Sequence, residues 1–237
     1  MKVFGLVQAR MGSNRFPGKM MEPLGAWPVI EWVLARSLQA QRADAVVLAT
    51  SDKHGDDVLC DVATRLGVDV FRGDEADVLG RYAAAAKQSD ASVVVRVCGD
   101  RPLVDPVLID AAIDDFASGG ADLTFNHTSD GAENWPKGFG AEVLSADLLY
   151  KMSDRVESPY HREHVTSFVW HDRDTYRVRP VSCPPEIDPG IADLKLDVDE
   201  PEDLERLRRL LPDASLSVGT PEVIRAWRAT ATDPDTA

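Results

Sequence analysis

The first residues that suggest chemistry lie in a loop near the N-terminus. The stretch VQARMGSNRFPGK, residues 7–19, follows an apolar run, Val3–Val7, that predicts a buried strand. Glycine lets backbone N–H groups approach anionic oxygens, and Arg and Lys neutralise them, so such a loop suits a polyphosphate. The residues that would do this are Arg10, Gly12, Ser13, Arg15, Gly18 and Lys19. The spacing matches neither the Walker A pattern nor the dinucleotide-binding glycine pattern, and an ordinary basic surface loop remains the alternative.

Carboxylates follow two later segments of the chain. Asp100 comes just after the apolar run Ser92–Val97, where a carboxylate can hold Mg²⁺ against phosphates. Gly-Asp-x-Pro is also good turn chemistry, so a local capping role for Asp100 stays open. Asp197 and Asp199 alternate across one residue and would share a face of an extended segment. Two carboxylates on one face favour a cation between them, although Asp199 could instead cap the helix that follows.

One arginine lies inside an apolar strand. Arg96 interrupts the run VVVRV, where an unpaired charge is costly. It must therefore reach a carboxylate, a ligand or the end of the sheet, and structural pairing with an acidic residue is as good an interpretation as ligand binding.

Strands and helices alternate through the first half of the chain. Strands are predicted at 3–7, 45–50, 68–71 and 92–97, and helices at 28–38, 58–66, 77–87 and 106–117. This alternation predicts an α/β fold with a mostly parallel sheet and helices on both faces. Ligands of such sheets bind at the carboxyl ends of the strands. The loop 10–19, Thr50–Asp52 and Asp100 all follow such ends, which predicts one shared site.

The second half is less regular. Residues 122–136 are polar and irregular, and the elements predicted after them are a strand at 138–144, helices at 147–152 and 159–170, a strand at 176–181 and a Pro-rich loop at 183–190. A helix then begins near Pro201 and a last one at Thr220. We expect a single domain over 1–212 with an insertion at about 126–190 that covers the site and contributes a dimer contact. A C-terminal helix and a tail, disordered from Thr230, would occupy 213–237.

Composition narrows the class of protein. The chain has 237 residues, 44% hydrophobic and 28% charged, with no apolar run of about 20 residues and no signal-peptide pattern, so we expect a soluble cytoplasmic protein. Cys60, Cys98 and Cys183 are widely spaced and predict no disulfide framework or zinc site. The net charge of −14 argues against nucleic-acid binding. An acidic protein that binds a polyanion needs local cations and usually Mg²⁺.

Five motifs together resemble one family. The loop motif AR-x-x-S-x-R-x-P-x-K is followed, in order, by DVLGRY at 77–82, GDRPLVDP at 99–106, REHVT at 162–166 and DVDEPEDLERL at 197–207. This set resembles the cytidylyltransferases that make CMP-activated sugar acids, including the 3-deoxy-manno-octulosonate and acylneuraminate enzymes. The form QARMGS-x-R-x-PGK is most similar to the spore-coat polysaccharide biosynthesis branch. The resemblance implies a Rossmann-like nucleotide-diphospho-sugar transferase fold and a homodimer.

The resemblance also implies a reaction and a set of site residues. The reaction is Mg²⁺-dependent transfer of CMP from CTP to a 2-keto sugar acid, with release of pyrophosphate. Arg10, Lys19 and Asp100 would be catalytic, and Asp100 and Asp199, with Asp197 as a further ligand, would hold the metal. The nucleotide would contact Ala9, Arg10, Gly12, Ser13, Arg15, Lys19 and Arg81, to which position in the predicted strands adds Thr50, Ser51, Asp52 and Arg96. Lys137 and Glu142 lie where the family's acceptor-contacting strand is expected. Arg162, Glu163 and His164 are further candidates for contact with the small acidic acceptor, although the resemblance assigns them no roles and a lone His on a helix is usually structural or solvated.

One departure from the family leaves the acceptor open. The family pattern Gly-x-Asp-x-Glu-Val is expected near residue 140, but this chain has Gly140 in place of the aspartate. A nucleotidyltransferase that uses another base, or a phosphonate or hydroxy acid as acceptor, is therefore a second hypothesis. A glycosyltransferase is a third, although its Asp-x-Asp would follow a middle strand, whereas here the pattern occurs only at 197–199. A non-catalytic nucleotide-binding module is a fourth.

Overall fold

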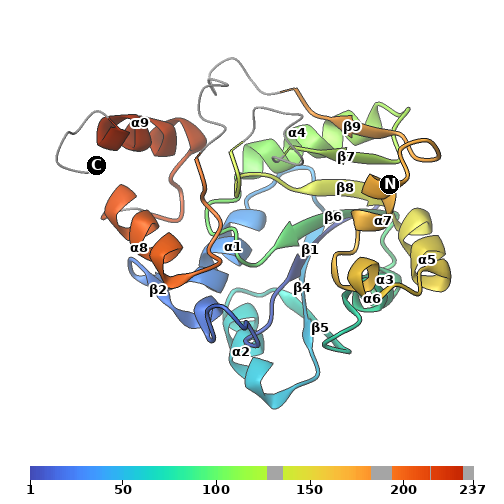
Figure 1. Cartoon of the computed structure of the whole chain (residues 1–237), viewed down its shortest axis with the longest axis horizontal. Helices are drawn as coiled ribbons and strands as arrows, with labels where there is room; N and C mark the ends of the chain where they lie inside the picture. The colour runs from blue at the N-terminus through green and yellow to red at the C-terminus, as the bar shows by residue number, and fades with distance from the viewer. Residues whose placement is uncertain (127–135, 183–193, 214, 232–237) are drawn as a thin grey trace.

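The computed structural model describes residues 1–126, 136–182, 194–213 and 215–231. Within these residues a mixed sheet runs through the centre of the molecule (Figure 1). Its strands, in spatial order, are β5 (Asp69–Gly73), β4 (Ala45–Ser51), β1 (Val3–Gln8), β6 (Val93–Cys98), β8 (Glu142–Ser145), β7 (Leu123–Phe125) and β9 (Val178–Pro180). The first four are parallel, β8 is antiparallel to both of its neighbours, and β9 is parallel to β7. The predicted mostly parallel α/β fold is confirmed.

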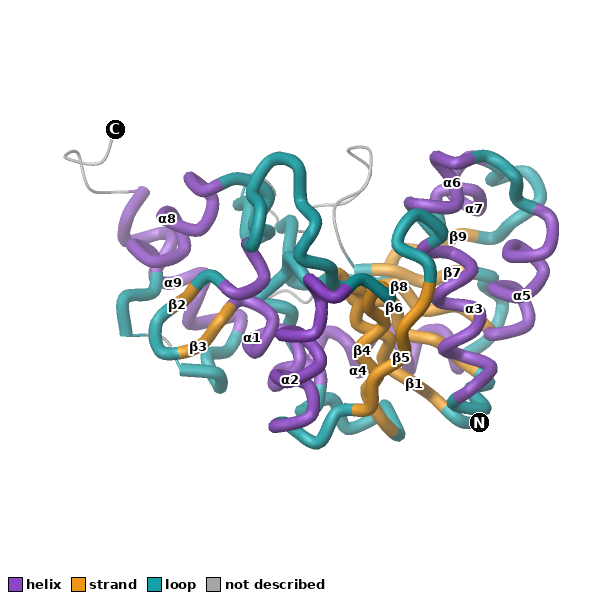
Figure 2. The backbone as a smooth tube through the Cα atoms, turned by 90° about the horizontal axis from the view of Figure 1, so that it is seen from below, coloured by secondary structure: helices purple, strands orange, loops and turns teal. Residues whose placement is uncertain are grey.

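Helices cover both faces of this sheet (Figure 2). One face packs against α1 (Val29–Ser37), α2 (Asp57–Arg65), α4 (Pro106–Ala117), α8 (Pro201–Leu210) and α9 (Thr220–Ala231). The other packs against α3 (Val78–Gln88), α5 (Ala146–Arg155), α6 (Pro159–Glu163) and α7 (Ser167–His171). Successive side chains of a strand point to opposite faces, so Val93 and Val95 enter one core while Val94 enters the other.

The predicted helix boundaries have local causes. Asp77 caps α3 by accepting a hydrogen bond from the Gly80 N–H at 2.9 Å, and Asp105 caps α4 by accepting one from Val107 at 2.8 Å. Gly67, with φ of 70°, ends α2 in the left-handed conformation that glycine adopts without strain. These boundaries follow from local chemistry, which explains why the sequence predicts them.

The second half of the chain differs from the prediction. The single helix predicted over 159–170 is wrong, because α6 and α7 are separated at Val165, which has φ of 41° and is fully buried. The strand predicted from 138 begins only at Glu142. β7, inside the stretch predicted to be irregular, was missed, as was the short hairpin of β2 (Pro23–Leu24) and β3 (Trp27–Pro28).

The C-terminal region packs onto the main core. Val218, Val223 and Ile224 are buried in the same cluster as residues of β1, and α9 continues to Ala231, beyond the predicted start of the tail at Thr230. Residues 232–237, the Pro-rich segment 183–190 and part of the predicted insertion lie outside the described residues. None of the helices in the described ranges is long and apolar enough to cross a membrane.

Candidate nucleotide-binding site

A cavity of about 360 Å³ opens at the carboxyl ends of β1 and β6. It gathers twelve of the predicted site residues, namely Ala9, Arg10, Gly12, Ser13, Arg15, Lys19, Arg81, Arg96, Asp100, Glu163, His164 and Asp199. The loop after β1 lies beside the end of β6 because Gly99 lacks a side chain. A Cβ there would lie 2.6 Å from the Gln8 carbonyl oxygen, which instead accepts a hydrogen bond from the Gly99 N–H at 2.8 Å. This close approach places Asp100 next to the loop.

Lys19 is the cation at the centre of the acidic side of the cavity. Its side chain is 9% exposed, and its ammonium group donates a hydrogen bond of 2.7 Å to the carbonyl of Val198. The same group lies 3.5 Å from Asp100 and 3.7 Å from Asp199. The fold therefore directs two predicted metal ligands, far apart in sequence, toward one positive charge.

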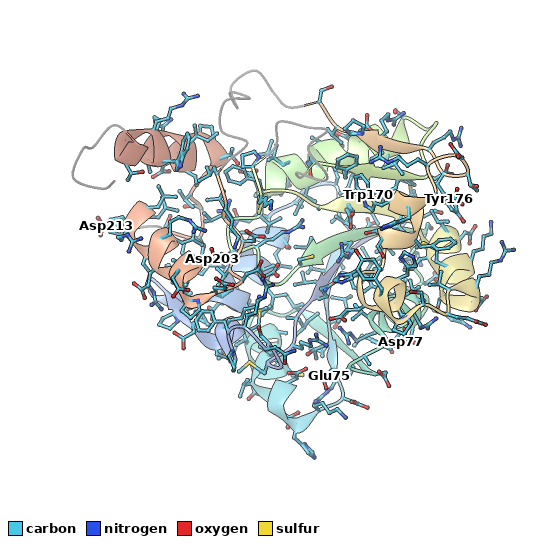
Figure 3. All side chains as sticks on the ribbon, viewed as in Figure 1. Glu75, Asp77, Trp170, Tyr176, Asp203 and Asp213 are labelled. Atoms are coloured by element: carbon cyan, nitrogen blue, oxygen red, sulfur yellow. The ribbon has the colours of Figure 1, made fainter. Side chains whose placement is uncertain are left out.

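Asp199 is held by its surroundings. Its carboxylate pairs with Arg15 at 2.8 Å, and its backbone N–H donates to Asp203 at 2.8 Å. Asp203, in the first turn of α8 and labelled in Figure 3, also accepts hydrogen bonds from Lys195 at 2.6 Å and from the Glu200 N–H at 3.0 Å. Asp203 and Glu200 thus form the capping box of α8, so the capping role weighed for Asp199 belongs to its neighbours.

Asp197 is a buried carboxylate with an unused oxygen. Its Oδ1 is buried and has no hydrogen-bond partner, although Lys195 lies 4.0 Å away. Burial raises the pKa of the Asp197 carboxyl, Lys195 acts in the opposite direction, and the carboxylates of Asp100 and Asp199 raise it again. A cation would remove this repulsion and satisfy the orphaned oxygen, so this donor set fits a hard divalent ion. In the described ranges, however, no three acidic, His or Cys side chains form a ready-made metal centre.

Two arginines converge on the opposite side of the cavity. Arg10 and Arg81 both donate to the Glu75 carbonyl, at 3.3 and 3.4 Å, and Arg10 also pairs with Glu163 at 3.0 Å. Arg81 is 3% exposed, and its Nε has no hydrogen-bond partner. Burial lowers the pKa of the Arg81 guanidinium; Tyr82 opposes this, and the neighbouring Arg10 lowers it further. An anion placed between the two guanidinium groups would relieve their repulsion.

Arg96 and Glu142 form a buried ion pair at the edge of the cavity. The Arg96 guanidinium donates to the Glu142 carboxylate at 2.6 Å, and Glu142 is 2% exposed. The same carboxylate accepts hydrogen bonds from the Thr166 hydroxyl and from the Trp170 indole at 2.9 Å. Arg96 lines the cavity, whereas Glu142, predicted to contact the acceptor, holds Arg96 from behind. The structural pairing of Arg96 is confirmed, and its contact with a ligand stays a prediction.

Other predicted site residues lie outside the main cavity. Thr50 and Ser51 are buried, and their hydroxyls donate to Asp56 at 3.0 and 2.5 Å. Asp52 lines a neighbouring cavity of about 410 Å³ that shares Arg10 with the first. Lys137 is exposed, and its backbone pairs with that of Lys195.

Arg162, also predicted to contact the acceptor, is engaged elsewhere. It holds α6 onto α3 through Asp77, which Figure 3 labels on the side of the molecule away from Asp203. It also donates hydrogen bonds to the carbonyls of Ser153 at 3.0 Å and Val156 at 2.7 Å. Only Glu163 and His164 of the predicted acceptor set line the cavity.

Sequence reasoning missed several residues of this site. Asn14 and Cys98 line the cavity without having been predicted, although both are next to predicted elements. Asp56 and Asp203 hold the loop and Asp199 from behind, and acidic residues at helix starts carry no signal that separates this role from ordinary capping.

Comparisons with known proteins show which proteins this chain is similar to. A family model described as Cytidylyltransferase matches residues 4–214. The spore coat polysaccharide biosynthesis protein SpsF of Bacillus subtilis is 35% identical over 224 residues, covering 90% of each chain. A solved cytidylyltransferase from Leptospira borgpetersenii superposes with a TM-score of 0.88 at 28% identity, over 100% of this chain and 96% of that one.

A more distant structure shares the fold. CMP:2-keto-3-deoxy-manno-octonic acid synthetase, solved in complex with CTP, has a TM-score of 0.67 at 18% identity and covers 90% of this chain and 99% of its own. The family model spans most of the chain, and its match includes the loop, Asp100 and Asp199. Because the family model matches residues 4–214 and the basic loop and the carboxylates lie at one edge of the sheet, the chain belongs to the cytidylyltransferase family of nucleotidyltransferases.

Proposed function

We propose that this cytidylyltransferase transfers CMP from CTP to a sugar acid, in a reaction that uses Mg²⁺ and releases pyrophosphate. The observation that carries the proposal is the meeting of Lys19 with Asp100 and Asp199, opposite the pair formed by Arg10 and Arg81. One side of the cavity suits a cation and the other suits an anion. A nucleoside triphosphate with its metal carries both charges in one ligand.

The acceptor is proposed by analogy and by charge. The relative SpsF is named for polysaccharide biosynthesis, and the CTP-bound structural neighbour is named for a 2-keto sugar acid. His164, within the predicted insertion, lines the cavity and would donate a hydrogen bond to an acidic or hydroxylated acceptor. The pyrophosphate assay below separates a sugar acid from a phosphonate or a hydroxy acid as the acceptor.

The chain's own residues would position and neutralise charge. Arg10, Ser13 and Lys19 would hold the β- and γ-phosphates, and they would stabilise the negative charge that develops on the departing pyrophosphate. The acceptor hydroxyl would attack the α-phosphorus in line and release its proton to solvent. The new P–O bond would form as the bond from the α-phosphorus to the bridging oxygen breaks, and that oxygen would leave with pyrophosphate. Ser13 has its hydroxyl hydrogen-bonded by the Phe16 N–H at 3.3 Å and has no basic partner among the described contacts, which favours direct displacement without a covalent intermediate.

Asp100 and Asp199 would hold Mg²⁺, with the unused oxygen of Asp197 as a further ligand. When bound, the ion would neutralise phosphate charge and polarise the α-phosphate. Because the described residues do not assemble three ready ligands, Asp100 and Asp199 would hold the ion more tightly when a nucleotide is bound beside them.

Pyrophosphate release tests the proposal. The enzyme would be mixed with Mg²⁺, with each of CTP, UTP, ATP and GTP, and with a panel of 2-keto sugar acids, phosphonates and simple hydroxy acids. Release confined to CTP with a sugar acid is the expected result. Release with a phosphonate alone would overturn the acceptor class, and release with another nucleotide alone would overturn the base.

A further inference from the structure

Asp56 is a buried carboxylate that the proposed mechanism does not use. It is 2% exposed and accepts four hydrogen bonds. Its Oδ2 accepts from the Thr50 hydroxyl at 3.0 Å and from the Ser51 N–H and hydroxyl at 3.1 and 2.5 Å. Its Oδ1 accepts from the backbone N–H of Met11 at 2.7 Å. The carboxylate therefore joins the end of β4 to the loop after β1, and the hydrogen bond between Met11 and Asp56 links residues 45 positions apart in sequence.

Asp56 stands at the N-cap position of α2 but does not cap that helix with its side chain. An aspartate immediately before a helix ordinarily caps the helix with its side chain. The side chain instead reaches back to the loop. Its Oδ2 keeps the nearby donors of Thr50 and Ser51, and its Oδ1 is used for the long-range hydrogen bond from the Met11 N–H.

Met11 is the residue through which this contact would act. Its carbonyl accepts hydrogen bonds from the N–H groups of Ser13 at 2.9 Å and Gly18 at 3.3 Å, so its peptide closes the loop on itself. Its own N–H belongs to Asp56 and is not available to a ligand. Met11 lies between Arg10 and Gly12, both of which line the cavity. Fixing Met11 therefore fixes which side chains and N–H groups of the loop face the ligand.

The Asp56 carboxylate is satisfied by direct hydrogen bonds from uncharged groups. In the described part of the chain its carboxylate has no ion-pair partner within 4.0 Å, and its two oxygens are satisfied by uncharged donors. A buried carboxylate of this kind depends on every donor, because each lost hydrogen bond leaves charge uncompensated. The hydrogen bond from the Met11 N–H to the Asp56 carboxylate thus holds the Met11 peptide in place.

We propose that Asp56 is a positioning residue that sets the polyphosphate-binding geometry of the loop through Met11. The proposal rests on the proposed function only in taking the ligand of the loop to be a polyphosphate. Asp56 does not contact the ligand, and its effect passes through the Met11 peptide to Arg10 and Gly12.

The test compares Asp56→Asn with Thr124→Val. Asparagine keeps the size of the side chain but replaces one acceptor oxygen by an amide that faces N–H and O–H donors. Thr124→Val, in β7, removes a buried hydroxyl that donates to the Ala112 carbonyl at 3.1 Å. Strands β6 and β8 separate β7 from β1, so this variant leaves the contacts of Asp56 intact. Both variants are expected to be less stable than the wild type. Inorganic tripolyphosphate is the probe, measured by calorimetry, because its binding depends on neither the base nor the acceptor.

The expected result separates the two variants. Asp56→Asn should bind tripolyphosphate about tenfold more weakly and raise KM for CTP more than KM for the acceptor, whereas Thr124→Val should bind tripolyphosphate as the wild type does. Equal weakening in both variants at equal loss of stability would reduce Asp56 to a fold-stabilising residue and overturn the proposal. Wild-type binding of tripolyphosphate by Asp56→Asn would also overturn it.

A measurement on the wild type covers the case in which Asp56→Asn does not fold. The Met11 amide should be protected from hydrogen exchange to the degree of a core amide, with or without tripolyphosphate. Exchange at the rate of an exposed loop amide would overturn the proposal. If the wild type binds tripolyphosphate but no nucleotide releases pyrophosphate, the proposed function fails while the inference on Asp56 stands.

Discussion

The ammonium group of Lys19 lies between the carboxylates of Asp100 and Asp199, 3.5 Å from the first and 3.7 Å from the second. The lysine comes from the N-terminal loop, and the two aspartates come from the end of β6 and the entrance to α8. Because the ammonium already compensates part of their charge, it competes with any second cation for the same carboxylates. Lys19 therefore bears on both metal affinity and catalysis.

Lys19→Met should uncouple these two effects. Without the ammonium, Mg²⁺ alone should bind more tightly than in the wild type and should raise Tm more. The value of kcat should fall at least about 100-fold, because a fixed positive charge facing the leaving phosphates is lost. Thermal melts in MgCl₂ and steady-state kinetics measure the two. Lys87→Met, at an exposed position of α3, is the control. An unchanged Mg²⁺ response would contradict competition by Lys19.

Asp100→Asn should abolish most activity at little cost to stability. We expect kcat to fall at least about 100-fold, because the neutral amide is a poor ligand for a hard cation. Tm should change little, because the Asp100 carbonyl keeps its hydrogen bond from the Val198 N–H at 2.8 Å. Asp61→Asn, on the exposed face of α2, is the matched control. Full activity of the variant in Mg²⁺ would remove Asp100 from the metal site.

Glu163→Gln should tighten nucleotide binding. Glu163 pairs with Arg10 at 3.0 Å and would compete with phosphate for it, but the pair is half-exposed and the effect should be modest, about threefold in Kd for CTP at low salt and less at high salt. Glu157→Gln, exposed on the same segment, serves as the control. Weaker CTP binding would instead show that Glu163 holds Arg10 in its working position.

Glu142→Gln should destabilise the fold. The carboxylate is the ion-pair partner of buried Arg96, and neutralising one member of such a pair costs about 3 kcal/mol of unfolding free energy. Urea unfolding measures this cost, with Glu205→Gln, from an exposed pair with Arg208, as the control. If Glu142→Gln kept the stability of the wild type and raised KM for the acceptor, the result would support the predicted contact between Glu142 and the acceptor.

Asp203 should contribute stability that depends on pH. Burial acts to raise the pKa of its carboxyl, but hydrogen bonds from Lys195, the Asp199 and Glu200 N–H groups and Arg206 lower it well below its usual range. A depressed folded-state pKa means that the contribution is complete above the unfolded value of about 4 and is lost as pH falls below it. Asp203→Asn should therefore be less stable than the wild type at pH 7.

The pH series provides the internal check for Asp203. The difference in unfolding free energy between Asp203→Asn and the wild type, measured by urea titration, should narrow steadily as the pH is lowered from about 5 to 3. A difference that stays constant over this range would show that the stabilisation comes from packing and not from the ionised carboxylate.

Local chemistry determined most of what is predictable about this protein. Strand and helix periodicity, the caps at Asp77 and Asp105 and the stop at Gly67 depend on neighbours in the sequence, so the α/β fold and its parallel strands are predicted correctly. The topology rule for such sheets then brings the loop, Asp100 and the end of β4 to one edge. That rule needs no knowledge of side-chain contacts.

The tertiary structure decided how the charges pair. Glu142 and Arg162 are charged residues in family-like motifs. Glu142 of β8 pairs with Arg96 of the neighbouring strand β6, and Arg162 of α6 pairs with Asp77, the cap of α3. Val165 combines a positive φ with a fully buried side chain, and this break lies between α6 and α7, where propensity alone predicts one continuous helix. Periodicity reports which face of an element is buried, but a charged side chain takes the partner that packing brings within reach. That partner, as with Asp56 and Met11, is often tens of residues away and leaves no local signal.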